Sequence, residues 1–164
     1  MTCLMAQPRY APNGQLTLPS DYREWVFVSS GLGMRYALGQ NGPPDFTNVF
    51  VNPSAYRSFL STGTWPDKTT LVLEVRASSS KGSINQAGSY QSEVLAVEAE
   101  VKDTKFPGNG WAFFAFGKSS TGKLLTRTQD CYSCHLAHGA VDNTFVQFYP
   151  VLLDVAKQKG TFKP

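Results

Sequence analysis

Three side chains suited to cofactor chemistry lie together in the run Cys131-Tyr132-Ser133-Cys134-His135. Two thiols three positions apart match the two vinyl groups of one porphyrin, and the histidine after the second thiol can ligate its iron. This C-x-x-C-H pattern is the covalent attachment signature of haem c. We therefore predict one haem c (iron) per chain, bound through Cys131 and Cys134, with His135 as the proximal metal ligand.

The same residues permit two other interpretations, a zinc site and a thiol redox centre. His138 would be the fourth zinc ligand, but the adjacent Cys134 and His135 make tetrahedral closure awkward. The usual spacer of roughly a dozen residues between ligand pairs is also missing. A redox C-x-x-C usually begins a helix within a βαβ pattern, whereas this one follows a polar stretch, 117–130. Both alternatives fit the sequence less well than haem.

The composition favours a single domain over residues 1–164. Of the 164 residues, 41% are hydrophobic and 13% aromatic, which is enough for a substantial core. The net charge is +3 with only 16% charged residues, and the sequence has no basic stripe of the kind that nucleic acid requires. No apolar stretch approaches the roughly 20 residues that span a bilayer. We expect neither a nucleic-acid partner nor a membrane span.

Residues 1–10 are expected to be a disordered remnant of an export leader. They include the third cysteine, Cys3, which has no assigned role once the other two thiols are bound to haem. Haem c is attached after export in bacteria, so a periplasmic location follows from the predicted cofactor.

The hydrophobic pattern predicts an α+β fold, a mainly antiparallel β-sheet with a few helices and the haem near the C-terminus. Asn52 as N-cap, Pro53 at the first position and Gly63 at the end mark one helix. Strands are expected at 25–28, 46–51, 69–76, 90–101 and 111–116.

Two segments carry stripes whose orientation matters for the cofactor. In the predicted strand 90–101, apolar residues alternate with Glu98 and Glu100, which predicts that both glutamates face solvent. Between 145 and 156 apolar residues recur at helical spacing, and Pro150 marks a point where the helix either kinks or begins. Phe148 belongs to this stripe, which faces the core or the haem.

The group on the iron opposite His135 decides between functions. His138 follows too closely in the chain to reach the opposite face of the porphyrin. Met34 lies outside the N-terminal segment that holds Met1 and Met5, and its ligation would give a six-coordinate electron carrier. Without such a ligand the iron has an open distal face that suits a small molecule.

Further motifs follow one another in a recognisable order. C-Y-S-C-H at 131–135 precedes V-D-N-T-F-V-Q-F-Y-P-V-L at 141–152, and the segments 18–26, 51–56 and 106–114 come before them. With these motifs the chain resembles the cytochrome P-460 family, which includes the β-type cytochromes c′. The resemblance implies a mostly antiparallel sheet with a few helices, one haem c, a vacant distal site and a homodimer.

Two branches of that family differ in chemistry, and the resemblance implies where to look for the difference. Hydroxylamine-oxidising members carry a lysine that is cross-linked to the haem edge, and the matching position here is Leu73. Lys68 and Lys81 flank the strand but belong to a turn and to a Gly/Ser loop. Some catalytic members also place a carboxylate in the pocket, for which Glu74 and Glu93 are candidates.

An apolar distal wall is expected instead, as in the β-type cytochromes c′. Leu73 would share a strand face with Leu71 and Val75, and Phe50 and Phe148 are candidate rings beside the haem. Such a pocket favours nitric oxide or similar small ligands. The leading hypothesis is a periplasmic, dimeric mono-haem protein that binds such a ligand. The alternative is a hydroxylamine-oxidising oxidoreductase that passes electrons to a partner cytochrome.

Overall fold

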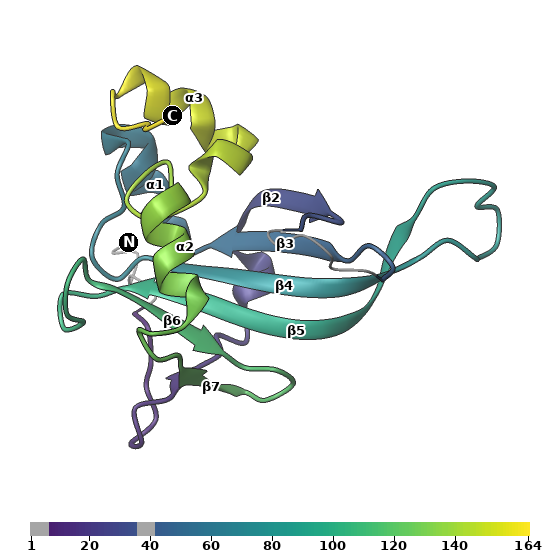
Figure 1. The fold of residues 1–164 in the computed structure, drawn as a ribbon, viewed down its shortest axis with the longest axis horizontal. Coiled ribbons are helices and arrows are strands. Elements are labelled where there is room, and N and C mark those ends of the chain that lie inside the picture. The colour runs from purple at the N-terminus through teal and green to yellow at the C-terminus, as the bar shows by residue number, and fades with distance from the viewer. Residues whose placement is uncertain (1–6, 36–41) are drawn as a thin grey trace, which may run out of the picture.

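The computed structural model describes residues 7–35 and 42–164 (Figure 1). Within them, one antiparallel sheet has the strand order β1-β7-β6-β5-β4-β3-β2. The strands are β1 (Leu16–Thr17), β2 (Val26–Leu32), β3 (Phe46–Val51), β4 (Thr70–Ser79), β5 (Tyr90–Lys102), β6 (Trp111–Ala115) and β7 (Thr121–Leu124). The helices are α1 (Pro53–Thr62), α2 (Asp130–His138) and α3 (Pro150–Gln158), with 3-10 turns η1 (Tyr22–Glu24) and η2 (Val146–Phe148). The predicted α+β class is confirmed.

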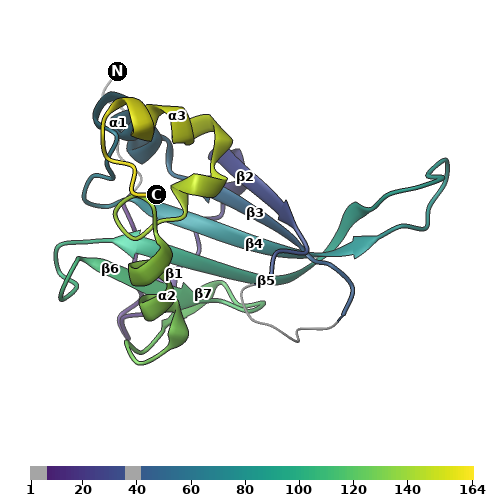
Figure 2. The ribbon, with the colours of Figure 1, turned by 45° about the horizontal axis from the view of Figure 1, so that its top comes forward.

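The helices gather at one end of the sheet, and the β4–β5 hairpin projects from the other end (Figures 1 and 2). Helix α2 crosses one face of the sheet, and α1 and α3 lie together beside it. The described helices include none that is long and apolar enough to cross a membrane.

Most predicted elements are present, and three were missed: helix α2 and the strands β1 and β7. The strand at 46–51 has the predicted bounds, β4 extends beyond its predicted end into the projecting hairpin, and β5 runs one residue further, to Lys102, at its other end. The short strands β1 and β7 were not predicted. β7 reads T-G-K-L and lies in the polar stretch after β6, so it has too few apolar residues for a periodic signal.

Helix α1 begins and ends where the sequence predicts, with Pro53 in its first turn and Gly63 after it at φ +75°. Asn52 occupies the predicted N-cap position, but its side chain forms no capping hydrogen bond. Its Oδ1 accepts a hydrogen bond of 2.8 Å from the backbone N–H of Thr70, so it ties the start of α1 to β4. At the C-terminal end, Pro150 begins helix α3 rather than kinking it.

Strand register determines which side chains share a face. Leu71 on β4 lies opposite Glu100 on β5, and Leu73 lies opposite Glu98. Directly opposed residues of an antiparallel pair point to the same side. The two glutamates therefore lie on the apolar face that helix α2 covers, and the prediction of a solvent face is wrong for Glu100, which is only 8% exposed.

The opposite face of the sheet packs against the N-terminal segment. Its buried residues include Leu16, Tyr22 and Trp25, which meet Val72 of β4. Tyr10 also packs there, 6.1 Å from Phe114 between ring centroids, so the N-terminal segment that was expected to be disordered contributes to this packing. Residues 1–6, including Met1, Cys3 and Met5, lie outside the described residues.

Glu74 is buried on this opposite face and not in a cofactor pocket, contrary to its suggested role as a pocket acid. Its carboxylate accepts hydrogen bonds from the Tyr22 hydroxyl, from Arg23 Nε at 2.8 Å and from Arg76 Nε at 2.5 Å. Burial raises the pKa of Glu74, but the hydrogen bonds from Arg76, Tyr22 and Arg23 outweigh it and hold the pKa below its usual value.

Glu74→Gln should therefore destabilise the protein in a pH-dependent way. A lowered carboxyl pKa contributes stability above the ordinary value of 4.5, and that contribution is lost as the pH falls through the lower folded value. We expect the variant to lose about 2 kcal/mol at neutral pH, since both guanidinium groups are partly exposed, and to approach wild type in acid. Denaturant unfolding at about pH 7 and about pH 3 measures this. A difference that is the same at both pH values, or is matched by the exposed-site control Glu93→Gln, would contradict it.

Candidate functional site

A cavity of about 320 Å³ lies between helix α2 and the sheet. Cys131, Cys134 and His135 line it from the helix, and β4 contributes Leu71 and Leu73. The lining is predominantly apolar, with the polar groups confined to a few positions. It is thus a partly open, mainly apolar space with two thiols and one imidazole on one wall, which fits a haem site.

The motif reaches the cavity because it is helical. Residues at i, i+3 and i+4 lie on the same face of an α-helix, so Cys131, Cys134 and His135 all point the same way. Tyr132 holds the helix against the sheet, with its ring 4.7 Å from that of Phe113 and its hydroxyl 3.3 Å from the Leu125 carbonyl oxygen.

Of the six predicted cofactor-binding residues, the structure brings five to this cavity: Cys131, Cys134, His135, Leu73 and Phe148. Phe50 is not among the residues that line it. Successive side chains alternate across a strand, so the ring of Phe50 points away from the face that carries Val49. It packs on Tyr22 and Phe27 instead, each 5.7 Å away between ring centroids.

The methionine, lysines, glutamate and histidine that the sequence suggested as further ligands or pocket residues do not all lie at the cavity. Met34 lines the cavity. Lys68 forms an ion pair of 2.6 Å with Asp103, and Lys81 lies exposed in the β4–β5 hairpin loop, so neither is at the cavity. Glu93 and His138 are exposed.

His135 has its Nδ1 atom engaged by the protein. Nδ1 lies 2.8 Å from the backbone carbonyl oxygen of Asn143 and 3.2 Å from Oε2 of Glu100. The ring is flanked by Phe113 and Phe145, with centroids at 4.6 and 4.3 Å. Because a carbonyl oxygen only accepts hydrogen bonds, Nδ1 carries the proton and Nε2 is left as the ligating nitrogen. The residues present therefore fit a haem whose iron is held by His135.

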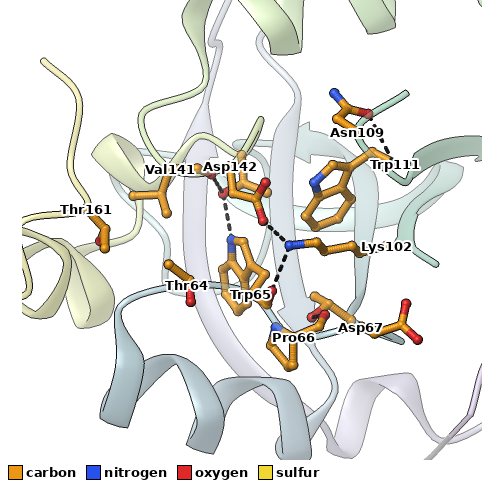
Figure 3. Close-up of polar contacts among 12 residues, drawn as sticks. Thr64, Trp65, Pro66, Asp67, Lys102, Asn109, Trp111, Val141, Asp142 and Thr161 are labelled. Carbon is orange, nitrogen blue, oxygen red and sulfur yellow. Dashed lines mark hydrogen bonds and ion pairs between the residues drawn. The ribbon is translucent and has the colours of Figure 1, made fainter. Parts of the chain in front are cut away.

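The Asn143 carbonyl is fixed by a tight turn after α2. Asp142 and Asn143 both have positive φ, +48° and +67°, which non-glycine residues adopt only when the surroundings hold them. The Nζ of Lys102 pairs with the Asp142 carboxylate and donates to the Trp65 carbonyl oxygen at 2.8 Å, as Figure 3 shows. Trp65 in turn donates from Nε1 to Thr144 Oγ1 at 2.8 Å.

The charges around the cavity alter three pKa values. Burial lowers the pKa of His135, but Glu100, the Asn143 carbonyl and Glu98 outweigh it, so the value lies above the usual one. Burial raises the pKa of the Cys131 thiol, and the charge of Glu98 adds to this. Burial also raises the pKa of Glu98, against the opposing effect of His135.

These features weigh against the two alternatives to haem. A thiol redox centre needs a lowered cysteine pKa, and that of Cys131 is raised although the motif does begin a helix. Across the described residues, no group of three or more histidine, cysteine or acidic side chains is arranged to hold a metal ion such as zinc.

Sequence reasoning missed Glu98, Glu100 and Lys102 as site residues. The apolar sequences of the neighbouring strands already indicated that the part of β5 around Glu100 is covered on both faces. A glutamate such as Glu100 in a central strand, flanked on both sides by strands as apolar as 70–75 and 111–116, has little solvent to face. Strand order was needed to use this indication, and the sequence does not give strand order.

Gly139→Ala should loosen the turn that fixes the Asn143 carbonyl. Gly139 has an ordinary φ of −68°, but an added Cβ would lie 2.6 Å from the carbonyl carbon of Asn143 and 2.6 Å from His135 O. We expect a loss of about 1–3 kcal/mol of stability, measured by denaturant unfolding. Leu136→Ala, on the exposed side of the same helix, is the control and should cost much less. Equal stability of Gly139→Ala and wild type would contradict the tight packing.

Comparison with known proteins agrees with this site. Residues 19–146 match the family model described as Cytochrome P460, a range that holds the C-x-x-C-H motif and Leu73, Glu98 and Glu100. No curated protein matches the chain. Membership implies a haem cofactor, which the helix-borne thiols and the imidazole with a free Nε2 fit. The matched range covers most of the 164 residues, and the chain therefore belongs to the cytochrome P460 family.

Proposed function

We propose that this protein is a mono-haem c protein that binds nitric oxide or a similar small ligand in an apolar distal pocket. Haem is attached through Cys131 and Cys134, and His135 is the proximal ligand of a five-coordinate iron. One observation carries the proposal: all three side chains share one helix face at an apolar cavity, with Nδ1 of the histidine already engaged.

Haem held by Cys131, Cys134 and His135 would supply an iron able to bind a small ligand. The chain's contribution is a mainly apolar lining with few hydrogen-bond donors. Val49, Leu71 and Leu73 line the cavity with apolar surface. The Ser29 hydroxyl donates to the Phe148 carbonyl oxygen at 2.6 Å, so its proton is not available to a ligand. Such a wall favours neutral ligands that need no donor.

The hydroxylamine-oxidising alternative is less well supported. The resemblance places its cross-linking lysine at Leu73, and Leu73 lines the cavity. Lys68 is engaged with Asp103 and Lys81 lies in the hairpin loop, so neither substitutes for it. Glu98 and Glu100 do line the cavity, so the pocket carboxylate of some catalytic members has a counterpart here, and the missing lysine is the difference that weighs against this alternative.

A periplasmic location and a homodimer complete the proposal. The location is supported by the C-x-x-C-H motif, because haem c is attached after export in bacteria. The homodimer is supported by the family to which the chain belongs. A partner cytochrome is required only by the hydroxylamine-oxidising alternative.

Covalent attachment is tested by removing one thiol at a time. Cys131→Ala and Cys134→Ala should each retain haem through a single thioether or lose it, because each thiol supplies one of the two bonds. The mass of the acid-denatured protein reports the attached haem. Ser133→Ala, exposed on the same helix, is the matched control and should keep the wild-type mass. Complete extraction of haem from denatured wild-type protein would refute covalent attachment.

The ligand is tested by the optical spectrum of the haem-loaded protein in ferric, reduced and nitric-oxide-treated states. We expect a high-spin haem c spectrum that changes when nitric oxide is added, because no strong ligand occupies the distal side. A strongly red-shifted Soret band on reduction would indicate a cross-linked macrocycle and favour hydroxylamine oxidation. A low-spin spectrum that is indifferent to carbon monoxide, and becomes high-spin in Met34→Leu, would show an electron carrier with Met34 on the iron.

A further inference from the structure

Glu100 is a buried acid with one carboxylate oxygen that has no hydrogen-bond partner among the described residues. Its side chain is more than nine-tenths buried, and its Oε2 atom forms no hydrogen bond among the described residues. Its direct neighbours across the sheet are Leu71 on β4 and Phe113 on β6, both buried and apolar. Burial of an uncompensated carboxylate is costly, so a partner of opposite polarity is required.

The imidazole of His135 is that partner. Oε2 of Glu100 lies 3.2 Å from Nδ1, whereas the Asn143 carbonyl oxygen lies 2.8 Å from the same atom. The single Nδ1–H is directed at the carbonyl, and the carboxylate lies beside it as a second acceptor. One proton thus has two acceptors, a neutral one from the turn after α2 and a negatively charged one from the sheet.

Strand β5 contributes to the position of both acceptors of the Nδ1 proton. It carries Glu100 directly, and two residues later it carries Lys102, which pairs with Asp142 and so fixes the Asn143 carbonyl (Figure 3). The Lys102 ammonium also lies 5.9 Å from the centroid of the Trp111 ring, its neighbour on β6. Because one strand sets both positions, the distances from Nδ1 to the two acceptors do not vary independently.

We propose that Glu100 is a positioning residue that draws the Nδ1 proton of His135 towards a negative charge and thereby makes the proximal imidazole a stronger electron donor to the haem iron. Partners of this kind on the far nitrogen of a ligating histidine fix its tautomer and raise its basicity. A stronger donor stabilises the ferric state relative to the ferrous state. The inference depends on ligation by His135 but not on which small ligand binds opposite.

The test compares Glu100→Gln with Glu98→Gln in the haem-loaded protein. Both changes remove one negative charge from the same cavity wall, but only Glu100 contacts Nδ1. For Glu100→Gln we expect a higher reduction potential and, in the reduced protein, a lower iron–histidine stretching frequency by resonance Raman spectroscopy. Glu98→Gln should raise the potential less and leave the stretching frequency unchanged. Equal potential shifts with an unchanged frequency in both variants would overturn the proposal.

A third variant changes the neutral acceptor and carries the test if Glu100→Gln does not fold. Asp142→Asn weakens the pairing with Lys102 that fixes the Asn143 carbonyl, so the Nδ1 proton should shift towards Glu100. We expect a higher iron–histidine stretching frequency in the reduced protein, opposite in sign to Glu100→Gln. A lower frequency would overturn the proposal. The potential can be measured whatever lies on the distal side, so failure of nitric oxide to bind refutes the proposed function alone.

Discussion

The contact between His135 and its two acceptors is the constraint on which the rest of the site depends. Helix α2 presents the imidazole to the sheet, and the carbonyl of Asn143 and the carboxylate of Glu100 fix how the ring is turned. The aromatic rings of Phe113 and Phe145 then leave the imidazole little freedom to rotate. The identity of the ligating nitrogen follows from these contacts before any cofactor is added.

The sheet has one buried glutamate on each face, Glu74 and Glu100, and the two differ in how many hydrogen-bond donors surround them. Glu74 is surrounded by donors from Tyr22, Arg23 and Arg76, so its charge is neutralised and serves stability. Glu100 has apolar neighbours and a single imidazole within reach. A buried carboxylate with a single polar neighbour concentrates its electrostatic effect on that neighbour, which here is the imidazole of His135. Buried charges of this kind are found more often at functional sites.

The sequence predicted which side chains would bind the cofactor better than it predicted which strand faces surround them. Cys131, Cys134 and His135 follow from spacing alone, and the helix 53–62 follows from its proline and glycine. Leu73 came from the family resemblance and lines the cavity. Phe50 and Glu100 were placed on the wrong face, because alternation gives two faces without saying which one is covered. That depends on pairing between strands distant in the sequence.

The order of the contacts along the chain bears on how the protein matures. Lys102 and Asp142 are 40 residues apart, and the imidazole is held by one acceptor that precedes it and one that follows it. Contacts between distant parts of a chain form late because loop closure must come first. The orientation of the histidine therefore depends on segments that lie on both sides of the motif in the sequence, and not on the helix that carries it alone. A short peptide with the C-x-x-C-H motif would carry the thiols and the imidazole but neither of the acceptors that orient the ring.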